Sequence, residues 1–364
     1  MKTIRRITVW ILKTGILLAA VSLAMSYFAR YVHPAGTWLF AFFGLLFPQL
    51  VVLNLLLAVL WIIIKRKIFW LHLAVILPSF FFLPAYVQWR GGSDKAGQPA
   101  QGDEIKIITY NVHLFGINTA ARTLQTLPGI AAFIGKEAPD IVCLQEAAVF
   151  DTAAVSRLFP DYPYIHFRPR RLFGKAWFIT ATLSRHPILN REVIVFPNSG
   201  NVCIYTDIAV HGQTVRVYNN HLESTRLNLA MSFSRLKEDT GRNEEIKRVT
   251  VRLRDAFKKR AAQVDTVAAH IASSPYPVLV CGDFNDLPMS YTYRKMKGRR
   301  HDAFMTAGSG MPSSFRSALP AFRIDYIFND DYFKATRFYI PKVRYSDHYP
   351  AVAVFTNGEL RMEN

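Results

Sequence analysis

The segment PVLVCGDFNDLP, residues 277–288, carries polar side chains directly after a short apolar run. The run Val278–Cys281 predicts a buried strand, which we expect to end at Gly282. Asp283 and Asn285 stand at positions i and i+2, and side chains at that spacing in an extended segment point to the same side. A carboxylate and a carboxamide could therefore act together on one reacting group. A turn is the alternative, because Gly, Asn and Asp are common turn residues.

Three more polar residues stand at the ends of apolar runs that predict strands. They are Asn111, Glu146 and His221. Because a buried carboxylate must be paired or bind a metal ion, we interpret Glu146 as a metal ligand or as one half of a salt bridge. Asn111 could orient a metal ligand or a phosphate, or could end its strand in a turn. His221 could contact a phosphate or could have a structural role.

A carboxylate and an imidazole precede the last expected strand. Asp347 and His348 are followed by a proline and an apolar run. Histidine is the usual acid or base near neutral pH, but it needs a partner that fixes its tautomer. Asp325, which lies among apolar neighbours, could be that partner, as the buried carboxylate is in hydrolase triads.

The elements expected to position these residues are short strands and two helices. The expected strands are 105–109, 139–146, 176–183, 202–210, 214–219, 278–281, 323–328 and 351–355. Helices are expected at 123–136 and 243–273, and irregular structure at 291–317. Glu146 is expected to be the last residue of its strand.

Taken together, the polar segments resemble those of the endonuclease/exonuclease/phosphatase superfamily, which includes DNase I-like nucleases, neutral sphingomyelinases and inositol polyphosphate 5-phosphatases. Seven segments match in the family's order, over residues 105–356. They are TYNVH (109–113), LQE (144–146), SRHPI (184–188), NHLES (220–224), GDFND (282–286), RIDYIF (323–328) and SDHYP (346–350). The combination of GDFN, IDYIF and SDHYP is highly specific.

This resemblance implies a four-layered α/β sandwich of the DNase I type and hydrolysis of a phosphoester with Mg²⁺ or Mn²⁺. In such a site Glu146 is the main metal ligand, with Asn111 and Asp347 beside it. An oxygen-rich set of this kind suits a hard cation. Residues 174–178 depart from the family pattern before SRHPI, so substrate contacts there do not transfer to this chain.

The resemblance also implies roles for the remaining site residues. Asp283 positions or deprotonates the attacking water. Asn285 and His221 donate hydrogen bonds to the phosphate oxygens. His348, oriented by Asp325, is the second acid or base or stabilises the transition state. Either Asp283 or His348 could be the general base.

Three apolar runs precede this region, at 7–27, 38–64 and 68–87. Each approaches or exceeds the ~20 residues that cross a bilayer, so we expect three transmembrane helices. The chain is thus similar to membrane-anchored bacterial members of the superfamily. We expect a membrane anchor at 1–89, a polar Gly-rich linker at 90–104 and the catalytic domain at 105–357.

Basic residues set the expected orientation. Lys2, Arg5 and Arg6 precede the first run, and the stretch 65–67 separates the second run from the third. By the positive-inside rule these sites are cytoplasmic, so three crossings leave the region after residue 90 outside. We therefore expect a multi-pass inner or plasma membrane protein with a periplasmic catalytic domain.

The chain is strongly basic, with 44 Lys+Arg against 26 Asp+Glu and a formal charge of +18. Such a charge favours nucleic acid, anionic lipid or phosphorylated small molecules as partners. The basic stretch 168–175, expected to be a loop, and the basic face of helix 243–273 could bind phosphates or headgroups, or could simply be solvated. Sequence-specific nucleic-acid binding is not expected, because no base-reading motif is present. The three cysteines predict buried thiols.

The expected function is therefore hydrolysis of a phosphodiester, in a phospholipid or a nucleic acid, by a membrane-anchored enzyme outside the cytoplasm. A non-catalytic binding or scaffold protein of the same fold is the alternative, because fold does not fix function. The polar segment 225–242 is interpreted as an insertion that could cover or extend the site. The sequence specifies neither the substrate nor the oligomeric state.

Overall fold

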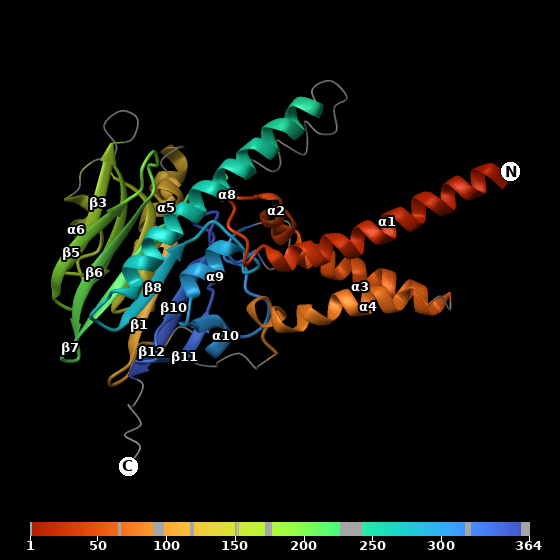
Figure 1. Cartoon of the computed structure of the whole chain (residues 1–364). Helices are drawn as coiled ribbons and strands as arrows, with labels where there is room; N and C mark the ends of the chain where they lie inside the picture. The colour runs from red at the N-terminus through yellow and green to blue at the C-terminus, as the bar shows by residue number, and fades with distance from the viewer. Residues whose placement is uncertain are drawn as a thin grey trace, which may run out of the picture. The chain divides into compact units, whose positions relative to one another are not determined.

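A computed structural model describes residues 2–64, 67–89, 98–116, 120–149, 151, 153–171, 177–225, 242–316 and 322–357 (Figure 1). The chain divides into two compact units. The first, here called the N-terminal unit, comprises Met1–Pro84, Thr225–Ala262 and Asp286–Arg294. The second, here called the sandwich unit, comprises Ala85–Ser224, Gln263–Asn285 and Lys295–Asn364. The domain boundaries predicted after residues 89 and 104 stay predictions.

The sandwich unit contains two six-stranded mixed sheets. The first has the order β11 (Phe333–Tyr339), β12 (Ala351–Asn357), β1 (Ile105–Asn111), β2 (Ile141–Val149), β4 (Trp177–Ser184) and β3 (Tyr164–Arg171). The second has the order β5 (Ile188–Val195), β6 (Val202–Val210), β7 (Gln213–His221), β8 (Val278–Asp283), β10 (Asp325–Asn329) and β9 (His301–Asp302). The pairs β1–β2 and β7–β8 are parallel, and the other pairs are antiparallel.

Apolar side chains from both sheets form one core between them. Ile107 and Cys143 from the first sheet lie in the same fully buried cluster as Val217, Cys281 and Ile327 from the second. Alternate strand residues point to opposite faces, so the other face of each sheet needs its own cover. The three cysteines are free and buried, as predicted.

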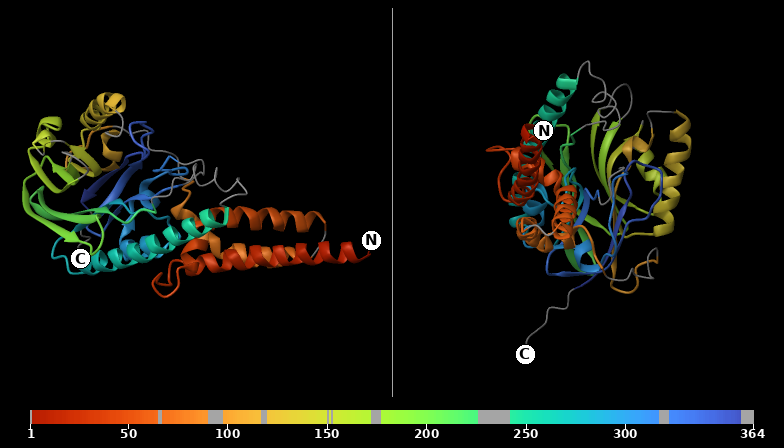
Figure 2. Two further views of the ribbon diagram at one scale, coloured as in Figure 1. Left: turned by 90° about the horizontal axis from the view of Figure 1, so that it is seen from above. Right: turned by 90° about the vertical axis from the view of Figure 1, so that its right-hand side faces the viewer.

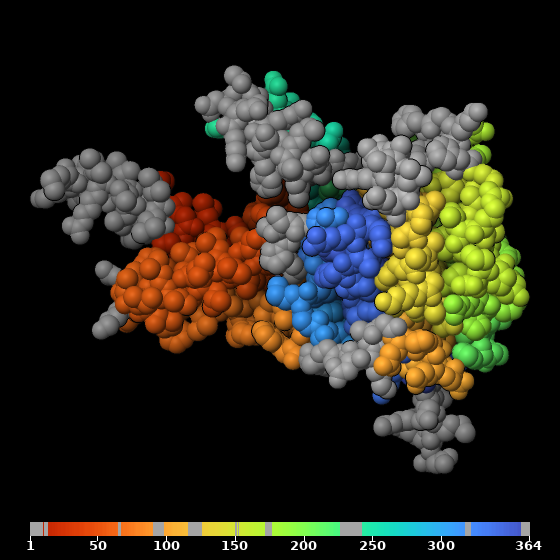
Figure 3. Space-filling model, turned by 180° about the vertical axis from the view of Figure 1, so that it is seen from behind, coloured from red at the N-terminus to blue at the C-terminus, as the bar shows by residue number. Residues whose placement is uncertain are grey.

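Helices supply that cover on the outer faces. Helix α5 (Ala120–Glu137) packs Ile130 and Ile134 into a second cluster with Tyr110 and Leu144 of the first sheet. Figure 3 shows this side of the sandwich unit, with α5 in yellow. Figure 2 shows α5 and the C-terminal part of α8 on opposite sides of the strands. The predicted α/β sandwich of two mixed sheets with outer helices is confirmed.

The cover on the second sheet is the end of helix α8 (Arg242–Ala272). His270 of that helix lies 2.9 Å, through Nδ1, from the hydroxyl oxygen of Tyr218 in β7. Val264, Val267 and Ile271, which recur at helical spacing, are buried on the same helix.

Several details of the sequence prediction are wrong. Residues 291–307, which were expected to be irregular, are mostly regular because they contain α9 (Tyr291–Lys297), β9 and α10 (Ala303–Ala307), whereas residues 308–316 form no helix or strand. Four residues of the expected basic loop, Arg168–Arg171, belong to β3, because they pair with β4. The rest of that loop, residues 172–175, lies outside the described residues, as does most of the predicted insertion, residues 226–241. Strands β5 and β11 were not predicted, and short helices η3 (His113–Gly116) and α6 (Ala154–Leu158) complete the unit.

The apolar runs of the N-terminal unit form helices that range from 3 to 27 residues in length. They are α1 (Lys2–Phe28), α2 (Leu39–Leu45), α3 (Phe47–Ile63), α4 (Phe69–Ile76), η1 (Leu77–Phe81) and η2 (Leu83–Ala85). The second run is broken by a 69° bend between α2 and α3, with Pro48 in the first turn of α3. Proline lacks the N–H that would continue the preceding helix, so a new helix begins there. Pro78 and Pro84 likewise stand in the 3₁₀ turns that follow α4.

Within the described residues, none of the helices has by itself the length and apolar character of a membrane span. The bent pair α2–α3, taken as one segment, has both. Three transmembrane helices therefore stay a prediction. Buried polar contacts connect these helices. The Asn54 Nδ2 donates to the Ala19 carbonyl oxygen at 3.1 Å, and its Oδ1 lies 2.8 Å from Nδ1 of His72.

Candidate active site

Strand register brings the predicted site residues to one end of the two sheets. In the second sheet, the parallel pairing of β7 with β8 sets His221 opposite Asp283, and the antiparallel pairing of β10 sets Asp325 opposite Asp283. In the first sheet, the parallel pairing of β1 with β2 sets Asn111 opposite Gln145. The carboxyl ends of β1, β7 and β8, the part of β2 around Gln145 and the start of β10 thus meet at one rim.

Asp347 and His348 reach the same rim from the segment before β12. That strand is antiparallel to β1, so its first residues lie beside the carboxyl end of β1. Ser346 fixes the segment there: its Oγ donates to the Asn111 carbonyl oxygen at 2.8 Å and accepts the His348 N–H at 3.1 Å.

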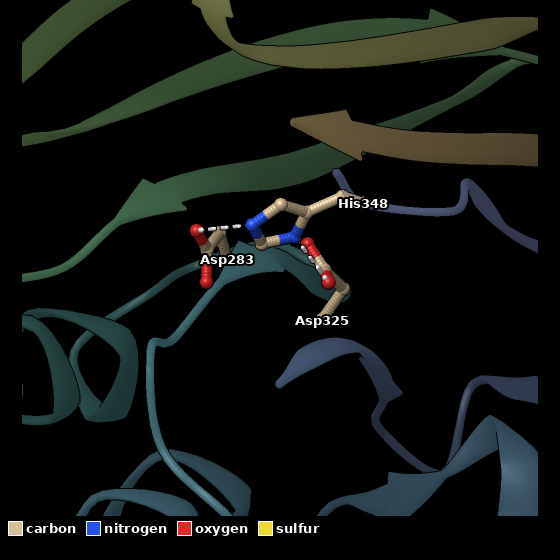
Figure 4. Close-up of side chains that lie close together, drawn as sticks. All are labelled: Asp283, Asp325 and His348. Atoms are coloured by element: carbon tan, nitrogen blue, oxygen red, sulfur yellow. Dashed lines mark hydrogen bonds and ion pairs between the residues drawn. The ribbon is translucent and has the colours of Figure 1, made fainter. Parts of the chain in front are cut away.

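His348 lies between two buried carboxylates (Figure 4). Its Nδ1 is 2.9 Å from Asp325 Oδ2, and its Nε2 is 3.8 Å from Asp283 Oδ2. The three residues are at most 5% exposed. Burial disfavours the charged imidazole, but the charges of Asp325 and Asp283 outweigh it and raise the pKa of His348 to about 10. The imidazolium therefore presents an N–H toward Asp283 at neutral pH.

Asp283 is held by three N–H donors. Asn111 Nδ2 donates to it at 2.9 Å, and Asn285 donates both its backbone N–H at 2.8 Å and its Nδ2 at 3.1 Å. Burial nevertheless raises the pKa of Asp283 to about 6, against the opposing charge of His348. Asn285 Nδ2 also donates to the Leu222 carbonyl oxygen at 3.0 Å. Its amide hydrogens are thus directed at protein oxygens, so a hydrogen bond to phosphate requires one of them to be released.

The sequence predicted that Glu146 ends its strand. This prediction is wrong, because β2 continues to Val149. The residue stands in a bulge, where the pairing with β4 shifts between Leu144 and Ala147, and its φ is +53°. A non-glycine residue in this left-handed region costs roughly 1–3 kcal/mol and is common at functional sites. The bulge turns a carboxylate that is 24% exposed toward the rim.

His221 contacts this carboxylate, with its Nε2 3.2 Å from Glu146 Oε1. Burial opposes the charged form of Glu146, but the contact with His221 lowers the pKa of Glu146 to about 2. The same pair raises the pKa of His221 against its burial. Within the described part of the chain, the buried Nδ1 of His221 has no hydrogen-bond partner, which fits a group that meets a substrate oxygen.

Two carboxylates at the rim could hold a divalent cation. His113 Nδ1 lies 3.4 Å from Asp347 Oδ1 and 3.9 Å from Glu146 Oε2, so both carboxylates face one imidazole. Carboxylate oxygens at a partly open position fit Mg²⁺ or Mn²⁺, which keep several waters. Asn111 fits less directly, because its Oδ1 accepts the His113 N–H at 3.1 Å and its Nδ2 faces Asp283. Its carboxamide must rotate before its oxygen can serve as a ligand.

Asp283, Asp325 and His348 form a second group, whose potential ligand atoms lie within 4.8 Å of one another. We consider it a hydrogen-bonded acid–base group rather than the cation site. The Nδ1 of His348 is already engaged by Asp325, and three N–H groups already donate to the carboxylate of Asp283.

The structure thus brings together all eight residues predicted from the sequence; their individual roles stay predictions. Sequence reasoning missed the amide pair beneath them, in which Gln145 Nε2 donates to Asn219 Oδ1 at 2.7 Å and ties the two sheets together. Gln145 directly precedes Glu146 and Asn219 stands two residues before His221, and this closeness to predicted site residues was the available signal. Asp286, the last residue of GDFND, is not one of the predicted site residues. In the N-terminal unit it accepts hydrogen bonds from Arg260 Nε at 3.1 Å and from Thr292 Oγ1 at 2.8 Å.

Solved structures with the same fold include three that cover most of this chain. The first is an endonuclease/exonuclease/phosphatase family protein from Bacteroides thetaiotaomicron, with 16% identity, a TM-score of 0.52, and coverage of 70% of this chain and 98% of that one. The second is D. rerio TDP2 complexed with a single-strand DNA product, with 18% identity, a TM-score of 0.51, and coverage of 70% and 100%. The third is the human Nocturnin catalytic domain with bound sulfate, with 18% identity, a TM-score of 0.50, and coverage of 71% and 96%. At these sequence identities, the comparison shows that the three structures and this chain share a fold, and nothing more.

No curated protein matches the chain. A family model described only as a domain of unknown function matches residues 8–86. The model of the endonuclease/exonuclease/phosphatase family matches residues 108–348, which is more than half of the 364 residues. The chain therefore belongs to the endonuclease/exonuclease/phosphatase family.

Proposed function

We propose that this protein is a divalent-metal-dependent phosphodiesterase. The observation that carries the proposal is the buried imidazole of His348 between the carboxylates of Asp325 and Asp283, at the same rim as the more open carboxylates of Glu146 and Asp347. A fixed acid–base group beside oxygen ligands is what phosphoester hydrolysis requires. Membership of the family supports action on phosphoesters.

In this proposal the two halves of the site have separate tasks. Glu146 and Asp347 hold Mg²⁺ or Mn²⁺, which when bound offsets negative charge on the phosphoryl oxygens. Asp283 orients the attacking water and accepts its proton. His348, kept protonated and aligned by Asp325, donates a hydrogen bond from Nε2 to the reacting phosphoryl group. His221 adds a second imidazole donor on the side of Glu146.

The experiment is a hydrolysis screen of the full chain in detergent micelles. Bis(p-nitrophenyl) phosphate, single-stranded DNA and phospholipid vesicles are incubated with Mg²⁺, Mn²⁺ or EDTA. We expect metal-dependent hydrolysis of at least one phosphodiester, with loss of activity in His348→Ala and Glu146→Gln. Metal binding without turnover of any phosphoester would instead favour a non-catalytic binding protein, and activity unchanged in both variants would refute the proposed site.

We further propose that the helices between residues 2 and 85 are embedded in a membrane, with the region after residue 90 outside the cytoplasm. In support, α3 and α4 expose large apolar side chains, including Leu56, Ile63 and Trp70, while Asn54 and His72 are buried. An apolar exterior around a polar interior suits lipid as the surroundings. The basic residues at the N-terminus and at 65–67 give the orientation.

The orientation is tested with reporters fused after residue 90 of the chain. Alkaline phosphatase, which is active only outside the cytoplasm, should be active, and a β-galactosidase fusion at the same point should be inactive. The reverse pattern would contradict the proposed orientation, and fractionation of the full chain with the soluble proteins would contradict the embedding.

A further inference from the structure

A hollow next to the candidate active site carries two arginines that the proposed chemistry does not use. Arg168 and Arg170 of β3 line it together with Phe178 of β4, Gly200 and Val202. Its volume is about 130 Å³, room for several waters or one small oxyanion. The ring of Phe178 lies 5.9 Å from the ring of His221, so this one side chain stands between the hollow and the imidazole that faces Glu146.

The geometry of β3 directs both arginines into this hollow. His166, on the same strand, is 2.9 Å through Nδ1 from Thr206 Oγ1 of the second sheet, so even-numbered residues of β3 face that sheet. Arg168 and Arg170 follow at two-residue spacing and therefore share this face. Arg171 lies on the opposite face, where its guanidinium stacks over Trp177 at 4.8 Å.

Two features hold a positive charge at this place. The Arg170 guanidinium stacks over the ring of Phe178 at 5.2 Å, and a Cβ atom built at Gly200 would collide with it. The missing side chain of Gly200 thus leaves the space that the guanidinium occupies. Neither Arg168 nor Arg170 forms an ion pair with any of the described residues, so their charges are available to a ligand.

We propose that this hollow is a subsite for a second phosphate group of the substrate, one linkage from the phosphodiester that is cleaved. The inference rests on the proposed function of the neighbouring site. Guanidinium groups bind phosphate oxygens with paired, charge-assisted hydrogen bonds, and two of them repel a cationic substituent such as choline. The enzyme therefore prefers substrates with two nearby phosphates over zwitterionic phospholipids.

Binding is measured first, because it needs no turnover. Thymidine 3′,5′-bisphosphate and thymidine 5′-monophosphate are titrated into the full chain in detergent micelles with EDTA. We expect the bisphosphate to bind about tenfold more tightly, the effect of roughly one charge-assisted hydrogen bond. Arg170→Gln should remove this preference. Gly200→Val should also remove it, because it displaces the guanidinium without changing the net charge.

Arg171→Gln is the matched control, because it removes the same charge from the adjacent position on the other face of β3. It should keep the preference. Equal binding of the two nucleotides by the wild-type protein, or an equal loss in Arg171→Gln, would overturn the subsite.

Turnover then distinguishes the source of the second phosphate. The dinucleotide pTpT is compared with TpT, and cardiolipin vesicles are compared with phosphatidylglycerol vesicles. A preference for pTpT that Arg170→Gln removes identifies oligonucleotides, and the same result for cardiolipin identifies a lipid with two phosphates. If the nucleotide preference persists but neither pair is hydrolysed, the proposed function fails while the subsite stands.

Discussion

Within the candidate site, His348 has a buried carboxylate on each side of its imidazole ring. Asp325 is fully buried and accepts from one side of the ring, and Asp283 lies on the other. An ionised carboxylate in this position is stabilised mainly by the imidazolium it contacts, so the two groups act as a unit. Removing either partner should therefore disable the other.

His348→Ala and Asp325→Asn are each expected to lower kcat by about 10²- to 10⁴-fold, as for loss of a positioned acid–base group. Because the residues act together, the double variant should be no slower than the slower single variant. The measurement is kcat on the best phosphodiester substrate, with circular dichroism as the check on folding. Additive losses would show that Asp325 acts independently of His348.

The elements bring these residues together through strand pairing, and one glycine is essential to it. Gly282 has a φ of +131°, and a Cβ atom there would collide with the backbone of Asn220 on the parallel neighbour β7. Only glycine lets β8 approach β7 closely enough to set Asp283 opposite His221.

Gly282→Ala is therefore expected to destabilise the protein by about 3–5 kcal/mol, from the steric overlap and the unfavourable φ together. Gly212→Ala is the matched control, because Gly212 has a φ of +79° but no atom within 4 Å of the point that a Cβ would occupy. Gly212→Ala should lower the free energy of unfolding by only about 1–2 kcal/mol. Denaturant unfolding of both variants gives the comparison, and equal losses would refute the steric argument.

The two sheets are also linked by a titratable contact between His166 of β3 and Thr206 of β6. Burial lowers the pKa of His166 to about 4, whereas an unfolded histidine titrates near 6.5. Below pH 6.5 the unfolded chain takes up a proton that the folded chain does not, so stability falls as the pH decreases from about 6.5 to about 4.

Between pH 6.5 and pH 4, His166 should lower the free energy of unfolding by about 3 kcal/mol. His166→Gln keeps a hydrogen-bonding side chain but cannot titrate, so its unfolding free energy should decrease less between pH 7 and pH 4. Urea unfolding of both proteins across this range makes the test. Parallel pH profiles for the two proteins would contradict the assignment.

At the scale of the whole molecule, a bound cation should couple the site to global stability. A ligand that binds only the folded protein stabilises it by about 2.7 kcal/mol at 100 times its Kd. Mg²⁺ or Mn²⁺ should therefore raise the apparent Tm, and EDTA should reverse the increase. Glu146→Gln should lose this response, whereas Asp151→Asn, an exposed carboxylate paired with Arg157, should keep it. An equal metal response in Glu146→Gln would exclude Glu146 as a ligand.

The sequence alone determined the family, the sandwich fold and the set of residues at the rim. Asp283, Asp325 and His348 could be predicted because Asp283 follows an apolar run, Asp325 lies within one and His348 precedes one, and strand ends in such a fold meet at one edge. The apolar runs of the N-terminal unit were equally plain. Pro48 accounts for the place where the second run breaks, whereas the 69° angle between α2 and α3 is given only by the structure.

Only the tertiary structure decided how these residues face one another. The left-handed bulge at Glu146 depends on its pairing with β4, and a single sequence does not contain that pairing. The orientation of the Asn111 carboxamide depends on its hydrogen bond to Asp283, and that of Asn285 depends on its hydrogen bond to Leu222. Both partners are far away in the chain. The arginine-lined hollow likewise combines β3 with Gly200, and such contacts arise only when long-range packing closes the two sheets on each other.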